Sequence, residues 1–298
     1  MLKSSALGVP SFKATLGAYL NLMKPHVTVL LLGTTLAAMA VAAGGMPGLG
    51  VTIATLLGGA MAAGSANSIN CYWDRDIDQI MGRTRSRSLP AGRVSATRAL
   101  IFGITLGVGA FAVLGLFVNL FAALLAESAI IFYVVVYTMW LKRTSTQNIV
   151  IGGAAGAVPV LVGWAAVTHS LGWAAIWMFV IIFLWTPPHF WALSLVLKKD
   201  YARASIPMLP VVRGDRVTHR RIVLYSALLL TSSLGLFFMH TMGYVYLTAA
   251  LVLGGGLLAF AVRLAWTRTL KDAHRLFWFS NYYLALLFAI MVIDRVWR

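Results

Sequence analysis

Long apolar runs recur nine times along this chain of 298 residues. Each is about 20 residues long, the length an α-helix needs to cross the hydrocarbon core of a bilayer. Inside a bilayer the backbone polar groups must be paired within the protein, so such runs are expected to be helices. The runs cover residues 26–45, 50–72, 96–118, 120–141, 148–168, 171–196, 220–240, 243–265 and 276–296. The sequence therefore predicts an all-α integral membrane protein, a bundle of about nine transmembrane helices forming one domain over residues 1–298.

The positions of the charges predict how this bundle sits in a membrane. A net charge of +16 would suit a nucleic-acid partner, but Lys and Arg fall almost entirely in alternate connections between the apolar runs. Only Arg295 and Arg298 lie on the other side, an asymmetry that follows the positive-inside rule. We therefore expect no nucleic acid as partner, and a protein embedded in the lipid bilayer of the cell inner membrane. The N-terminal segment 1–24 and the charged loops are expected in the cytoplasm, and the C-terminus outside.

Acidic residues gather at the end of the second run, in the sequence NCYWDRDID. On an α-helix, residues four apart lie in one stripe, so Asn70, Asp74 and Asp78 share a face. Asn67 falls in the same stripe, whereas Asp76 points away from it. Carboxylate and amide oxygens suit Mg²⁺, which usually binds one or two carboxylates together with phosphate oxygens of a substrate. The stripe predicts a Mg²⁺ site where the second helix meets the cytoplasm.

Basic residues follow this stripe at once, in the sequence RTRSR, which contains Arg83 and Arg87. Lys142 and Arg143, at the end of the fourth run, return to the same membrane face. Charge-assisted hydrogen bonds from such cations hold phosphate oxygens well. The pairing of acids and cations predicts a diphosphate-binding site, although ordinary polar helix ends and membrane topology are the alternative explanation of these charges.

A third acidic residue, Asp200, follows the sixth run and returns by topology to the face of Asp74 and Asp78. We expect it to supply a further metal contact, so the predicted catalytic residues are Asp74, Asp78 and Asp200. Two other acids lie toward the opposite end of the predicted bundle. We expect Glu127 to make a structural hydrogen bond and Asp294 to pair with Arg295 or Arg298.

The sixth run contains the sequence WTPPHFW, residues 185–191. Its two prolines remove backbone donors and break or kink a helix, which a membrane tolerates where protein or a cavity covers the freed carbonyls. The surrounding aromatic residues predict a cavity wall for a flat or isoprenoid ligand; a packed kink with a satisfied histidine is the alternative. The candidate residues for a haem or isoprenoid pocket are Asn67, Asn148, Trp185, His189, Tyr201 and Arg203, with Phe190 and Trp191 in the same wall.

These stretches resemble the UbiA-type intramembrane prenyltransferases, whose first motif is Asn-x-x-x-Asp-x-x-x-Asp after the second of nine helices. The resemblance extends over most of the chain. WTPPHFWAL and DYARASIPMLP are its most specific parts, and they resemble the members of that family that act on haem. One departure is Ala204, which stands where many members carry the last Asp of a second motif. Ser88 and His26 also replace the expected Pro and Arg.

The resemblance implies Mg²⁺ as cofactor and farnesyl diphosphate and haem b as substrates. The farnesyl group would pass to a vinyl group of haem b, with addition of water, to give haem O for haem–copper terminal oxidases. Handover of haem O to a haem A synthase or to oxidase assembly is implied as well. Two alternatives stay open, a prenyltransferase with an aromatic quinone-precursor acceptor and, from another class, a membrane transporter. The odd number of spans and the grouping of acids at one face argue against transport.

Overall fold

A computed structural model describes residues 11–297, so Arg298 and residues 1–10 of the N-terminal segment lie outside the described residues. Within 11–297, nine helical segments are long and apolar enough to cross a membrane, and there is no strand. The prediction of a nine-span, all-α membrane protein is confirmed. The spans are α2 (Pro25–Ala43), α3 (Leu49–Trp73), α5 (Ala96–Phe117), α6 (Leu120–Ile131) continued by the π-helix η1 (Phe132–Leu141) and by α7 (Lys142–Thr144), α8 (Asn148–Thr168), α9 (Trp173–Val196), α12 (Gly214–Phe238), α13 (Tyr244–Thr267) and α14 (Leu270–Val296).

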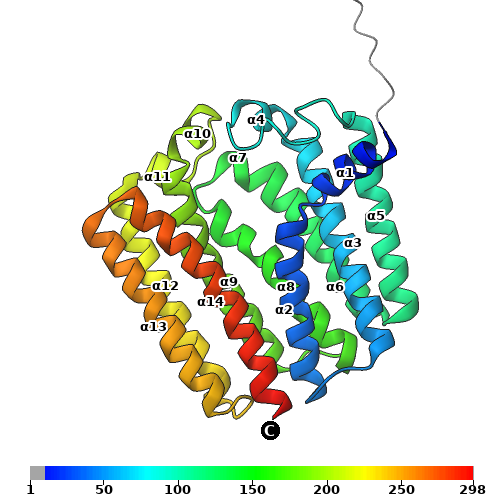
Figure 1. Ribbon diagram of the computed structural model, residues 1–298, viewed down its shortest axis with the longest axis vertical. Helices are drawn as coiled ribbons and strands as arrows, with labels where there is room; N and C mark the ends of the chain where they lie inside the picture. The colour runs from blue at the N-terminus through cyan, green and yellow to red at the C-terminus, as the bar shows by residue number, and fades with distance from the viewer. Residues whose placement is uncertain (1–10, 298) are drawn as a thin grey trace, which may run out of the picture.

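The spans run side by side, and the short helices gather at one end of the bundle, opposite the C-terminus (Figure 1). Helix α8 packs against both α2 and α9, and α14 packs against α2, α9 and α13. Four short helices were not expected as separate elements. They are α1 (Phe12–Leu22), α4 (Arg75–Ile80), α10 (Lys198–Arg203) and α11 (Leu209–Val212).

Helices α12 and α14 begin before the apolar runs that predicted them, at Gly214 and at Leu270. The first turns of both helices lie at the end of the bundle, where Arg216 and Lys271 are exposed. Thr269 caps α14 by accepting a hydrogen bond from the backbone N–H of Asp272 at 3.1 Å. Such a cap satisfies an otherwise unpaired donor of the first turn, so the helix extends beyond its apolar part.

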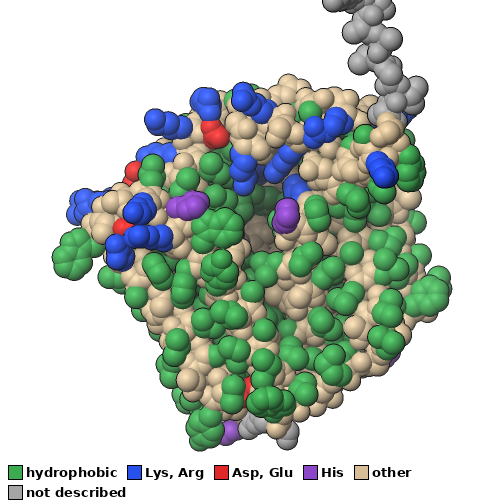
Figure 2. Space-filling model, viewed as in Figure 1, with side chains coloured by type: hydrophobic (Ala, Val, Ile, Leu, Met, Phe, Trp, Pro, Cys, Tyr) green, Lys and Arg blue, Asp and Glu red, His purple; other side chains and the backbone are tan. Residues whose placement is uncertain are grey.

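The surface of the bundle is divided by residue type. Lys and Arg side chains gather at the end that carries the short helices, and hydrophobic side chains cover much of the remaining face (Figure 2). Large apolar residues such as Ile101 and Val108 are well exposed within a membrane-spanning segment. An apolar belt with charges at one end is the surface of a multi-pass membrane protein.

Helix α9 continues from Trp173 to Val196 with Pro187 and Pro188 inside it, both buried. The sequence predicts a break or a kink here, and the break is wrong because the helix is continuous. Thr186 donates its hydroxyl to the carbonyl of Ile182 at 3.0 Å, so a side chain binds the backbone just before the prolines. Neighbouring helices bury the segment, which is the setting in which a membrane helix tolerates proline.

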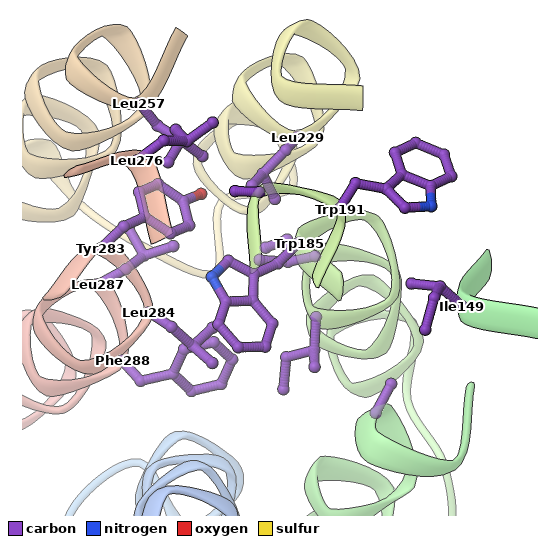
Figure 3. Packing of buried hydrophobic residues seen from close by; sticks show 14 of the residues in the cluster. Ile149, Trp185, Trp191, Leu229, Leu257, Leu276, Tyr283, Leu284, Leu287 and Phe288 are labelled. Atoms are coloured by element: carbon purple, nitrogen blue, oxygen red, sulfur yellow. The ribbon is translucent and has the colours of Figure 1, made fainter. Parts of the chain in front are cut away.

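The aromatic residues of α9 point in two directions. Trp185 lies toward α14, near Leu284 and Phe288, whereas Trp191 lies on another side of α9 (Figure 3). Trp191 meets the ring of Tyr225 from α12 edge to face, with 5.3 Å between centroids. Six helical positions separate the two tryptophans, about 600°, which turns Trp191 well away from Trp185. The prediction that Trp191 belongs to the same wall is therefore wrong.

The two acids toward the opposite end of the bundle differ from expectation. Asp294 is buried and accepts hydrogen bonds from the backbone N–H groups of Gly243 at 2.5 Å and Tyr246 at 3.1 Å. It thus caps the start of α13 and forms no ion pair with Arg295 within residues 11–297. Arg298, the other expected partner, lies outside the described residues. Within residues 11–297, Glu127 Oε1 is buried without a hydrogen-bond partner, so the expected structural hydrogen bond to that oxygen is absent.

Glycines allow the close approach of helix backbones in this bundle. A Cβ atom added at Gly163 of α8 would lie 2.3 Å from the carbonyl oxygen of Thr35 in α2. A Cβ atom at Gly156, seven residues earlier on α8, would meet nothing within 4 Å. The small residue is therefore required at the first position and not at the second.

We expect Gly163→Ala to destabilise the protein by about 1–3 kcal/mol, because the methyl group forces the α2 and α8 backbones apart. Thermal unfolding of the detergent-purified protein measures this. Gly156→Ala is the matched control and should be neutral or slightly stabilising, since alanine favours the helix over glycine. Equal melting temperatures for Gly163→Ala and wild type would contradict the close packing.

Candidate active site

The predicted stripe of oxygen ligands spans two helices. Helix α3 ends at Trp73 and α4 begins at Arg75, but the hydrogen-bond ladder continues across the junction. The N–H of Asp74 donates to the carbonyl of Asn70 at 2.9 Å, and the N–H of Asp78 donates to that of Asp74 at 2.8 Å. Asn70, Asp74 and Asp78 are all buried, whereas the side chain of Asp76 is mostly exposed. The predicted common face is confirmed.

Asp74 lies at the centre of this group and is only 1% exposed. Its Oδ2 accepts hydrogen bonds from Asn70 Nδ2 at 2.7 Å and from Lys142 Nζ. Its Oδ1 lies 3.7 Å from an Arg143 nitrogen, and it has no hydrogen-bond partner within residues 11–297. A buried carboxylate needs compensating charge, and Lys142 and Arg143 supply it from the end of the fourth span. The sequence predicts both cations at this end of the bundle, but as partners of a diphosphate and not of Asp74.

Asp78 has its own cation. Arg87 Nη1 donates to both carboxylate oxygens of Asp78, at 3.0 and 3.1 Å. Arg143 binds mainly elsewhere, with two 2.8 Å hydrogen bonds to the carboxylate of Asp76, which hold the pKa of Asp76 below its usual value. Arg83 is exposed and makes no hydrogen bond or ion pair in the described part of the chain. Arg83 and Arg87 both come from the loop that follows α4.

Asp200 does return to this region. A Cβ atom added at Gly82, in the loop after α4, would lie 3.6 Å from Asp200 Oδ2. The Asp200 carboxylate therefore faces the loop that carries Arg83 and Arg87. Arg203, three residues further on, is exposed and forms an ion pair with Asp200. Arg203 thus neutralises Asp200 at the exposed surface of the bundle, whereas the sequence predicts Arg203 inside a substrate pocket.

Sequence reasoning missed two residues of the site. Lys24 is not among the site residues that the sequence predicts, yet its Nζ donates to Asn70 Oδ1 at 2.8 Å, and burial lowers its pKa. Thr138 in η1 is fully buried and accepts a hydrogen bond from Asn70 Nδ2 at 3.1 Å. The Lys24-Pro25 sequence could have indicated Lys24, because proline favours the first position of a helix and so places the preceding lysine at the helix start. A π-helix often marks a functional site, but the sequence did not predict η1.

The other pocket candidates differ in their surroundings. Asn67 is buried and donates to the backbone carbonyl of Met23 at 3.1 Å, so it anchors the link before α2. Asn148 is 0% exposed, and neither amide atom has a hydrogen-bond partner within residues 11–297. Tyr201 is buried, which raises the pKa of its hydroxyl. Asn67 thus already binds the backbone through its amide nitrogen, and the pocket role of all three residues stays a prediction.

Trp185 and His189 form one assembly with α14. Their rings stack with 4.3 Å between centroids, and His189 also stacks on Phe277 at 4.7 Å. Trp185 Nε1 donates to the backbone carbonyl of Ser280 at 2.7 Å. His189 Nδ1 lies 2.7 Å from the hydroxyl oxygen of Ser280. Trp185, His189 and Phe277 therefore form an aromatic stack at this position, and Phe190 meets the His189 ring edge to face at 6.4 Å. The ligand-binding cavity expected beside them stays a prediction.

The donor set fits a bound Mg²⁺ ion. Asn70, Asp74 and Asp78 offer hard oxygen atoms, and the buried Oδ1 of Asp74 lacks a hydrogen bond within the described residues. No group of three His, Cys, Asp or Glu residues converges as a metal cage between residues 11 and 297. Mg²⁺ rarely uses such a cage and takes several of its ligands from water and substrate phosphate. The residues fit a metal that binds together with a diphosphate.

The loop arginine offers a direct test of the diphosphate site. We expect Arg87→Ala to raise the KM for a prenyl diphosphate about 10- to 100-fold, the loss of a hydrogen bond between charged groups. Binding of the haem acceptor that the resemblance implies should persist, because the change removes a cation from the predicted diphosphate site only. Steady-state kinetics and haem titration measure the two effects. Arg85→Ala, an exposed neighbour in the same loop, is the control, and an unchanged KM for Arg87→Ala would remove Arg87 from the site.

The fold and the site define a class of protein. Within residues 11–297, nine apolar helices enclose a cluster of buried acids and cations at one membrane face. Such a cluster can hold a metal ion together with an anionic group at one end of the bundle. A model of the UbiA prenyltransferase family matches residues 31–287. The chain belongs to this family, so it is a prenyltransferase, and the transporter interpretation is wrong.

Relatives and solved structures agree with this assignment. The chain is 53% identical to the protoheme IX farnesyltransferase of Gloeobacter violaceus, over 99% of this chain and 97% of the relative. It is also 53% identical to the enzyme of that name from Symbiobacterium thermophilum, over 93% of each chain. A solved UbiA homologue from Archaeoglobus fulgidus, bound to DMAPP and Mg²⁺, shares the fold with a TM-score of 0.67. That structure is 17% identical and covers 92% of this chain and 99% of its own.

Proposed function

We propose that this protein transfers the farnesyl group of farnesyl diphosphate to a vinyl group of haem b, with addition of water, to give haem O. The observation that supports the diphosphate half of this proposal is the pairing of two buried carboxylates, Asp74 and Asp78, with the partly exposed cations Lys142 and Arg87. The acceptor rests on the relatives at 53% identity, which are named for farnesyl transfer to protohaem IX.

The chain's own cations would bind the diphosphate. Arg87 lies in ion-pair contact with Asp78, Lys142 with Asp74, and Arg143 with Asp76. Arg83, which is exposed, adds a fourth cation from the same loop as Arg87. Hydrogen-bond donors that are already in position stabilise the charge that develops on the leaving diphosphate, because they need not reorganise during the reaction. These four residues would therefore orient the diphosphate and lower the barrier to cleavage of the allylic C–O bond.

Asn70, Asp74, Asp78 and Asp200 are the residues proposed to hold Mg²⁺. When bound, Mg²⁺ would supply Lewis-acid stabilisation of the departing diphosphate. Asp74 and Asp78 present their oxygens from the junction of α3 and α4. Asp200 approaches from α10, across the loop at Gly82. A second motif acid is missing because Ala204 occupies its position, so this side of the site depends on Asp200 alone.

The acceptor reacts without help from a covalent protein nucleophile. The vinyl group of haem b would attack the farnesyl cation and form a carbon–carbon bond, and the resulting cation would take up water and lose a proton. The apolar helices would keep other water away from the farnesyl cation. The aromatic surface of Trp185, His189 and Phe277 would lie against the porphyrin, with Asn148 and Tyr201 nearer the cytoplasmic end.

The distribution of charge along the chain supports one membrane location and orientation. We propose that the whole chain acts as one domain in the cell inner membrane, with the charged loops in the cytoplasm and the C-terminus outside. The separation of charge in Figure 2 supports this orientation through the positive-inside rule. Haem O would then pass within the membrane to a haem A synthase or to oxidase assembly.

The test uses purified, detergent-solubilised protein with haem b, farnesyl diphosphate and Mg²⁺, and identifies the porphyrin products by mass. We expect haem b to gain one farnesyl group and one water molecule. Unmodified haem b with intact farnesyl diphosphate, in folded protein, would contradict the proposal. A parallel reaction with an aromatic quinone precursor separates the two acceptors, because prenylation of that compound alone would replace haem b as the substrate.

A further inference from the structure

Ser280 determines which nitrogen of His189 carries the proton. The Ser280 hydroxyl lies 2.6 Å from the backbone carbonyl of Phe277, and a carbonyl only accepts hydrogen bonds. The hydroxyl proton therefore points to Phe277. The same hydroxyl oxygen, 2.7 Å from His189 Nδ1, must then accept, so Nδ1 carries a proton. In a neutral imidazole this leaves the lone pair on Nε2.

The imidazole ring is also held in position. It stacks on Trp185 with an angle of 19° between planes and on Phe277 with an angle of 30°. Trp185 is fixed in turn by its hydrogen bond to the Ser280 carbonyl. One residue of α14 thus positions both aromatic side chains of α9. A ligand that is pre-oriented in this way loses little freedom on binding.

The second ring nitrogen of His189, Nε2, makes no hydrogen bond that would stabilise the fold within residues 11–297. It is also not among the fully buried unpaired polar atoms of these residues. A histidine with only a packing role is expected to have both ring nitrogens hydrogen-bonded or fully buried. Here one nitrogen is bound, the tautomer is set, and the other nitrogen presents an accessible lone pair. This is the arrangement that proteins use for a metal-ligating histidine, whose other nitrogen donates to a fixed acceptor.

We propose that Nε2 of His189 ligates the iron of haem b, with Ser280 as the positioning residue that sets the tautomer. This inference rests on the proposed function, since it concerns the haem substrate. Imidazole is a common axial ligand of haem iron. Ligation would fix the centre of the porphyrin relative to α9 and α14, and so the distance of its vinyl groups from the diphosphate site. Trp185 and Phe277 would support the ring on either side of this bond.

The test compares haem b with protoporphyrin IX, which has the same ring and no iron. We expect His189→Ala to weaken binding of ferric haem b by at least about tenfold, with loss of the histidine-ligated Soret spectrum. Binding of protoporphyrin IX should stay within about twofold of wild type, because no metal bond is lost. Ser280→Ala should weaken haem b binding in the same direction and less. His274→Ala, an exposed histidine of α14, is the control.

Each outcome decides the inference. An equal loss of affinity for haem b and protoporphyrin IX would show that His189 contacts the porphyrin ring without ligating the iron. Unchanged binding of both porphyrins would show that His189 does not contact them. If His189→Ala does not fold, resonance Raman spectra of the ferrous haem complex of the wild type decide, because an iron–histidine band must be present. A wild type that forms the farnesyl product without that band overturns the ligation and leaves the proposed function intact. A wild type that neither binds haem b nor forms the product overturns both.

Discussion

Asp74→Asn is expected to lower prenyl transfer by about 100-fold or more, the usual cost of removing one preorganised electrostatic group. Asp74 is the most buried acid of the site, and it contacts Asn70 and Lys142 at once. The amide keeps the shape of the side chain and removes its charge. The variant would thus lose both a proposed metal ligand and the charge partner of Lys142. Initial rates of product formation from purified protein measure the effect.

The loss must be separated from unfolding, because Asp74→Asn leaves the Lys142 ammonium without its carboxylate. Breaking a buried pair costs about 3–5 kcal/mol, whereas removing both partners is often nearly neutral. We therefore expect the double variant Asp74→Asn, Lys142→Gln to regain stability and stay inactive. Asp215→Asn, an exposed acid paired with Lys198, is the control for a lost surface charge. Near wild-type turnover in Asp74→Asn would refute the metal site.

Removal of divalent metal is the second large effect that we expect. With EDTA, product formation should fall by about 100-fold or more, because metal ions contribute several kcal/mol to stabilising a leaving diphosphate. Excess Mg²⁺ should restore the rate. Ca²⁺ should restore it poorly, since it is larger and prefers more ligands than this donor set offers. Full turnover in EDTA would contradict the proposed use of Mg²⁺.

The structure also predicts when the metal binds. The acids are already neutralised by Lys142 and Arg87, and the described residues form no three-acid cage. Calorimetric titration of the free protein with Mg²⁺ should therefore show weak binding. Addition of a non-hydrolysable farnesyl diphosphate analogue should strengthen binding, because its phosphate oxygens complete the coordination shell. Equally tight binding in both states would show that the protein alone builds the metal site.

The sequence alone determined the number of spans and the face of the site. Nine runs of apolar residues require nine helices, because a bilayer leaves the backbone no other way to pair its polar groups. Spacing by four placed Asn70, Asp74 and Asp78 on one face, which the structure confirms. Lys142 reaches the same face because the fourth span ends where the second one ends. These features depend on helix geometry and topology, and both can be read from one sequence.

Tertiary packing decided which residues form hydrogen bonds with the side chains of the site. Lys24 reaches Asn70 only because α2 packs beside α3, and Thr138 reaches it from η1. The double proline did not break α9, because neighbouring helices bury it. Contacts between residues far apart in the chain depend on which helices are neighbours, and that choice is made by the whole bundle. The pairing of His189 with Ser280, 91 residues apart, could be found only in the folded protein.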